Sequence, residues 1–429
     1  MKKLLALLLL TLLAPCVCAC SSLPQLEHQA YPISLSIDKT DDDKLSIAVQ
    51  VPRLSNVDAS SGQSAYAIFS ASARTYPEAL QLLEVTVPSE LRLSHLKSIV
   101  VSEQLARSDL FPVLIDSLIQ TYHLYGTAKV IISTGNAQKF IEAQQPTVGI
   151  RLSSSVVAML DHFEQKGYTP STTLYGLYSS LHSFYSDPIA TLAATWESPD
   201  EKSTGGSGDG SGSGGGSGGG SESSESSGGG SESSGGGSGG GSDEDDKTPS
   251  GSGDSGQFSL RDMHSGRPGQ LSRTGPDKNE YMGCALIKDG KMVGTLSGEE
   301  SRWLAILGGT LRCFSYVCQD QPVTLRVVKR PNFSLTCAPD KLSIALSIAF
   351  EASPLLTLPE LDVLRRQLES DISALFSACV SAGVEPFNLS EKAACQFPTA
   401  QAFVDYGFRE RFLSSERSML VSISAAKDD

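Results

Sequence analysis

Apolar and polar residues alternate along many stretches of the chain, while elsewhere the apolar residues recur at helical spacing. Alternation predicts strands, because successive side chains of a strand point to opposite faces of a sheet. A period near 3.6 predicts helices, as in the apolar stripe from Leu361 to Cys379. Strands are therefore expected at residues 33–37, 45–51, 66–71, 98–102, 129–133, 284–288, 291–296, 310–317, 323–329, 342–350 and 419–423, and helices at 75–83, 109–119, 136–142, 154–166, 171–185, 298–307 and 358–382.

Short motifs define the ends of several of these elements. Asp289-Gly290 lies between two apolar runs, which is the strongest short-range signal for a β-hairpin. Ser297 followed by Glu300 has the spacing of a capping box, in which each residue accepts a hydrogen bond from the backbone of the other. Gly383 follows the long apolar stripe and is expected to end that helix.

The order of these elements predicts an α+β, multi-domain protein with mixed β-sheets and packed helices. A stretch of glycine, serine and acidic residues interrupts the pattern at residues 201–257 and is too polar to form a core, so we expect a disordered linker. The predicted organisation is a signal peptide over residues 1–19, an N-terminal domain over 20–200, this linker, and a C-terminal domain over 258–429.

Charge changes this picture little. The formal net charge is −14, but residues 203–257 carry nine acidic residues and one lysine and so contribute −8 of it. The remainder is mildly acidic and shows no basic patch, which argues against nucleic acid as a partner.

The first residues indicate export. Lys2 and Lys3 precede an apolar run from Leu4 to Leu13, which is the order found in signal peptides and is too short for a membrane-spanning helix. Small residues lead up to Cys20, as in the lipobox of bacterial lipoproteins. We therefore expect Cys20 to be the lipidated N-terminus of the mature chain and to anchor it to a membrane; the alternative is an ordinary secretory signal cleaved nearby.

No set of residues with a catalytic or metal-binding spacing is found, so we expect neither an enzyme nor a cofactor or metal site. Ser94 and His95 are adjacent in sequence, which does not make a triad, and His95 is interpreted as a structural hydrogen-bonding residue. Cysteines in an exported protein allow disulfides, but Cys379 lies in the helical stripe and favours a buried thiol there. The six cysteines after the linker are Cys284, Cys313, Cys318, Cys337, Cys379 and Cys395.

Two regions resemble the Ger(x)C family, the C-subunit lipoproteins of spore germinant receptors. The first lies within residues 67–142, where Ser72 to Ala79 and Leu93 to Ala106 are similar to the family's capped helix and to its "H-x-x-x-I-x-I-x-E-x-x-A" strand and helix. The second runs from Gly283 to Leu296 and resembles the hairpin motif "G-x-A-x-F-K-x-x-K-L-V-G-x-L", followed by an "E-[TS]-R" helix start at Glu300.

This resemblance implies a non-enzymatic, lipid-anchored subunit on the outer face of the spore inner membrane, required for germination. Its expected partners are the A and B subunits of a germinant receptor. The alternative is an exported solute-binding lipoprotein, for which two similar lobes around a cleft would be expected.

Overall fold

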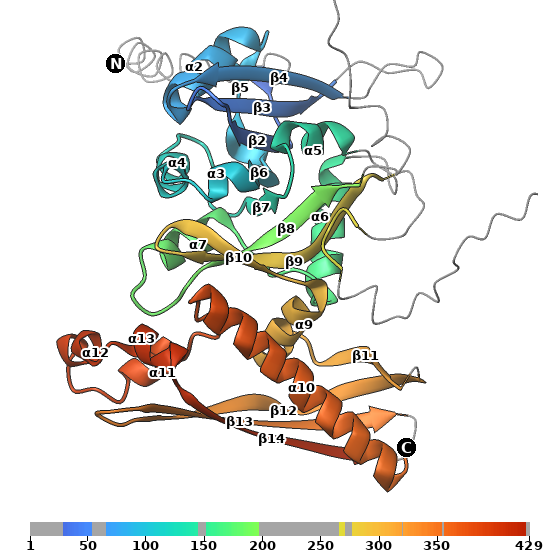
Figure 1. Ribbon diagram of the computed structural model, residues 1–429. Coiled ribbons are helices and arrows are strands. Elements are labelled where there is room, and N and C mark those ends of the chain that lie inside the picture. Colours follow the sequence, from blue (N-terminus) through green and yellow to red (C-terminus); the bar gives the residue numbers. More distant parts are fainter. Residues whose placement is uncertain are drawn as a thin grey trace, which may run out of the picture. The chain divides into compact units, whose positions relative to one another are not determined.

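The computed structural model describes residues 29–53, 66–144, 152–196, 266–270, 277–319, 321–353 and 356–425 (Figure 1). The predicted signal peptide, Cys20 and the predicted linker all lie outside these ranges. Within them, the α+β class with mixed sheets is confirmed.

A mixed sheet of eight strands, called the large sheet below, is built mainly from strands in the first half of the described chain. Its strand order is β10-β9-β8-β7-β6-β2-β3-β4, and the central pairs β2–β6, β6–β7 and β7–β8 are parallel. The strands are β2 (Ser34–Lys39), β3 (Leu45–Pro52), β4 (Tyr66–Ala73), β6 (Ser98–Ser102), β7 (Lys129–Ser133), β8 (Ile189–Thr195), β9 (Asn279–Lys288) and β10 (Lys291–Leu296). A short parallel pair, β1 (Gln29–Ala30) and β5 (Glu90–Leu91), forms separately.

Helices cover both faces of the large sheet (Figure 1). Because the central strands are buried on both faces, their residues form nearly continuous apolar runs. One face packs against α2 (Tyr76–Thr86), α3 (Glu103–Ala106), α4 (Leu110–Ile119) and α7 (Leu174–Leu181). The other packs against α5 (Ala137–Ala143) and α6 (Leu152–Gln165).

A second, four-stranded sheet, the small sheet, has the order β11-β12-β13-β14 and carries its helices on one face. Its strands alternate between buried and exposed residues, as expected when only one face is covered. The strands are β11 (Cys313–Cys318), β12 (Gln321–Cys337), β13 (Leu342–Ser353) and β14 (Glu416–Ala425). The helices are α9 (Gly298–Leu307), α10 (Leu358–Ala382), α11 (Leu389–Ala394), α12 (Ala400–Tyr406) and α13 (Phe408–Leu413).

The β9–β10 hairpin belongs to the cores of both sheets. Alternation along β9 sends Ala285 and Ile287 into the core of the large sheet, while Cys284 and Leu286 enter the core of the small sheet. The large sheet therefore includes strands from both sides of the predicted linker, since β8 precedes it and β9 follows it.

Most predicted elements and motifs are confirmed. Asp289-Gly290 closes the β9–β10 hairpin, Ser297 and Glu300 form the capping box of α9, and Gly383 ends α10 with a φ of 71°. The helix predicted over residues 171–185 is shorter, because α7 ends at Leu181.

The side-chain predictions are only partly confirmed. Cys379 is a buried thiol, and all six cysteines after the linker are free. His95 is exposed and its imidazole lies edge-on against the ring of Tyr31, while its interpretation as a structural hydrogen-bonding residue stays a prediction.

Candidate functional site at the junction of the two sheets

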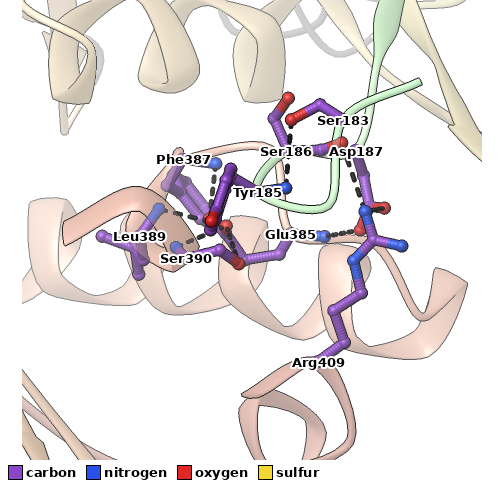
Figure 2. Close-up of polar contacts among 9 residues, drawn as sticks. All are labelled: Ser183, Tyr185, Ser186, Asp187, Glu385, Phe387, Leu389, Ser390 and Arg409. Carbon is purple, nitrogen blue, oxygen red and sulfur yellow. Dashed lines mark hydrogen bonds and ion pairs between the residues drawn. The ribbon is translucent and has the colours of Figure 1, made fainter. Parts of the chain in front are cut away.

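A buried polar network joins the segment before β8 to the helices of the small sheet (Figure 2). We call Asp187, Glu385, Ser390 and Arg409 the junction network. Asp187 lies at the end of the connection between α7 and β8, whereas the other three residues come from the helical layer of the small sheet. The network therefore connects parts of the chain that are about two hundred residues apart.

Asp187 makes the contacts across the junction. Its side chain is 2% exposed, and its Oδ2 accepts a hydrogen bond from the backbone N–H of Glu385 at 2.8 Å. Its Oδ1 pairs with the guanidinium of Arg409 at 3.0 Å, and Arg409 also donates to the carbonyl of Ser186 at 3.3 Å. One buried carboxylate thus holds the start of β8 against both α13 and the segment before α11.

Glu385 organises the turn that leads into α11. Its carboxylate accepts hydrogen bonds from the backbone N–H groups of Phe387 at 2.8 Å, Leu389 at 3.0 Å and Ser390 at 3.3 Å. The hydroxyl of Ser390 donates to the same carboxylate at 3.3 Å. The turn needs this support because Asn388 adopts a left-handed conformation with a φ of 55°, and the first N–H groups of a helix have no partner within the helix.

Burial sets the electrostatics of the junction network. It raises the pKa of Glu385 to about 7, because its effect exceeds that of the three backbone hydrogen bonds, and the neighbouring Asp187 carboxylate raises this pKa further. Burial also raises the pKa of Asp187, although Arg409 and the Glu385 N–H favour the ionised form. At the contact between the sheets, the pKa of each of these two carboxyl groups is therefore raised by burial and lowered by its hydrogen bonds.

A groove of about 610 Å³ lies beside the network, and we call it the junction groove. Thr169 and Thr172, which lie between α6 and α7, and Leu177 of α7 line the groove. Residues of α9 and of the turn before α11, including Leu304 and Asn388, line it as well. Asp187 also lines the groove, so the groove and the network share a side chain.

The contacts of the junction network are those of a structural element. Glu385 accepts hydrogen bonds from four donors, and Asp187 is held by an N–H group and a guanidinium, so both carboxylates are engaged in contacts within the protein. In the described ranges, no cluster of histidine, cysteine, aspartate or glutamate has the arrangement of a metal site.

The sequence prediction missed these residues. Asp187 and Glu385 each precede a proline, but nothing in either neighbourhood indicates that they meet. The site residue that was predicted, Cys20, lies outside the described residues and stays a prediction. None of the helices in the described part of the chain combines the length and the hydrophobicity that spanning a lipid bilayer requires.

Comparison with known proteins gives a family match over the N-terminal part of the chain. Residues 24–195 match the model of the spore germination protein N-terminal domain. This match confirms the resemblance to the Ger(x)C family seen in the sequence.

A structural search found the crystal structure of the GerBC protein. The two chains are 13% identical, with a TM-score of 0.45, and the similarity covers 92% of this chain and 97% of that one. A search of curated proteins found no match.

Proposed function

We propose that the chain is the membrane-anchored, non-enzymatic C subunit of a nutrient germinant receptor and is required for spore germination. The observation that carries this proposal is the match of residues 24–195 to the spore germination protein N-terminal domain. The structural contacts of the buried carboxylates at the junction support a non-enzymatic role for that site.

Anchoring rests on the sequence. The signal peptide over residues 1–19 would be removed and Cys20 would carry the lipid. The folded part would then lie on the outer face of the spore inner membrane, as the resemblance to the germinant-receptor C subunits implies. Its partners would be the A and B subunits of the receptor. Because two acyl chains give stable anchoring, no membrane-spanning helix is needed for this arrangement.

The alternative of an exported solute-binding lipoprotein fits the fold less well. Two similar lobes would be expected, but the described chain combines an eight-stranded sheet covered on both faces with a four-stranded sheet covered on one.

The test is the germination of spores that lack the gene. They should form normally, fail to respond to one class of nutrient, and germinate under a stimulus that bypasses nutrient receptors. Complementation with the wild-type gene should restore the response, and Cys20→Ala should restore less of it. A normal response to every nutrient in the deletion strain would reject the proposal.

A further inference from the structure

The N-terminal end of the described chain is fixed beside the C-terminal end of α2. Strand β1 pairs with β5, and Gln29 lies opposite Glu90. The carbonyl of Ala30 also accepts a hydrogen bond from the backbone N–H of Arg92 at 2.9 Å. Since α2 ends at Thr86 and β5 begins only four residues later, at Glu90, this pairing places Gln29 close to the end of the helix. Helix α2 and strands β3, β4 and β5 lie together at one end of the large sheet (Figure 1).

A groove of about 430 Å³ lies at the same place, and we call it the tether groove. It is bordered by β1, the residues that follow α2, the end of β3 and the start of β4. Of its described lining residues only Arg53 is charged, and that charge is positive. The apolar lining residues include Ala30, Val51, Ala67, Phe69, Val87 and Pro88.

The outer face of α2 continues this apolar surface. Val85 is 87% exposed and Leu82 is 50% exposed, and the two residues lie one helical turn apart. Val85 is two residues from Val87 of the groove, so the helix face and the groove adjoin. The acidic residues nearby, Glu84 and Glu90, line a different hollow. A single exposed apolar side chain is ordinary, whereas a continuous apolar patch of this kind is typical of an interaction surface.

The proposed lipid anchor brings a bilayer close to this surface. Cys20 is nine positions before Gln29. Nine residues span at most about 32 Å even when they are fully extended. A lipid on Cys20 therefore holds the membrane surface within about that distance of Gln29 and of the tether groove beside it.

The side chains of this surface suit the boundary between water and lipid. Leu82, Val85 and Phe69 gain free energy when they leave water for the edge of the acyl layer. Tyr31 and Arg53, which line the groove, each combine an apolar body with a polar tip. Such side chains favour the level of the lipid head groups, where the body is buried and the tip stays hydrated.

We propose that the tether groove and the outer face of α2, at Leu82 and Val85, rest on the lipid bilayer to which Cys20 anchors the chain. This inference rests on the proposed lipid anchor and adds an orientation to it. The end of the large sheet that carries β3 and β4 faces the membrane. Because the anchor keeps the local lipid concentration high, the few apolar side chains of this surface need only supply the orientation.

Tryptophan fluorescence of the full-length, lipidated protein in phosphatidylcholine vesicles tests the proposal. Bromine atoms on the lipid acyl chains quench a tryptophan that reaches them. The reporters are Val85→Trp and, as a second variant, Leu82→Trp, each combined with Trp196→Phe. Trp303 is kept, because it is buried in the core of the small sheet. Both reporters should lose fluorescence in brominated vesicles relative to vesicles without bromine.

Val404→Trp, also combined with Trp196→Phe, is the matched control. Val404 of α12 is another exposed valine, at 54%, and does not line the tether groove, so its fluorescence should be equal in both kinds of vesicle. Flotation of the vesicles on a density gradient measures anchoring separately. If the protein floats but neither reporter is quenched, or Val404→Trp is quenched equally, the proposed contact is overturned and the anchor stands. A protein that does not float has no anchor, which would reject the anchor and the contact together.

Discussion

Replacement of Glu385 by glutamine should remove a pH dependence of stability that the junction network creates. Glu385 is 2% exposed, and its pKa is raised to about 7 from 4.5, mainly by burial. The folded chain thus binds this proton more tightly than the unfolded chain does. The resulting stabilisation is complete below about pH 4.5 and is lost as the pH rises through about 7.

The difference between these two pKa values corresponds to about 3 kcal/mol in the free energy of unfolding. Glutamine does not titrate, so Glu385→Gln lacks this contribution at every pH. The variant should also lose stability by an amount that does not vary with pH, because its amide group cannot accept all the N–H donors that the carboxylate accepts.

The assay is urea unfolding followed by the fluorescence of Trp303, which is 2% exposed in the core of the small sheet, with Trp196 replaced by phenylalanine. The free energy of unfolding of the wild type minus that of Glu385→Gln should fall by about 3 kcal/mol between pH 4.5 and pH 8. Taking the difference between the two free energies of unfolding cancels the contribution of groups that titrate equally in both proteins.

The control variant is chosen from the groups that affect the pKa of Glu385. Asp187 and Cys379 interact with it electrostatically, and Arg409, Lys288 and Asp289 act on Asp187. Asp187→Asn should lower the pKa of Glu385 and so reduce the pH dependence without removing it. A difference between wild type and Glu385→Gln that stays constant from pH 4.5 to pH 8 would refute this reasoning.

Two further predictions rest on single contacts, and a third rests on the sequence before Cys20. Gly283→Ala should destabilise the protein by at least about 2 kcal/mol in a melting experiment, because Gly283 has a φ of 82° and the new Cβ would lie 2.2 Å from the carbonyl oxygen of Leu296; Gly135→Ala, with open space around it, should be nearly neutral. Arg409→Gln should lower the unfolding free energy by about 2 kcal/mol at pH 8, because Asp187 loses its cation, and adding Asp187→Asn should recover part of that loss in the same urea assay; no recovery would show that the ion pair is not the cause. Cys20→Ala should abolish incorporation of labelled palmitate, and undiminished labelling would exclude Cys20 as the lipid attachment site.

Local sequence signals predicted those elements whose ends are set by neighbouring residues. The β9–β10 hairpin follows from Asp289-Gly290, and α9 follows from its capping box, because in both cases the deciding hydrogen bonds lie within a few residues. Strand β8 was missed because its sequence, Ile189–Thr195, is rich in alanine and shows no alternation. Its five central residues are buried, so tertiary packing rather than local pattern makes it a strand.

The sequence prediction also missed the full length of β12 and the three helices α11, α12 and α13. Pro331 and a shift in register between Lys329 and Asn332 interrupt the alternation of β12, so only its first part resembled a strand. The helices α11, α12 and α13 have six or seven residues each, which is too short for a clear helical period.

The junction network could not be predicted, because its contacts are not local. Asp187 bonds to Glu385 across 198 residues, and each carboxylate alone is an ordinary acidic residue before a proline. Only the fold brings them together and buries them.

The central claim, that the chain is the C subunit of a germinant receptor, is tested most directly by affinity purification of the tagged, full-length protein from spore membranes. We predict that mass spectrometry of the purified material will identify two integral-membrane proteins, the A and B subunits, and that neither is recovered from an untagged strain. Recovery of the tagged chain from the membrane fraction without either subunit would contradict the claim.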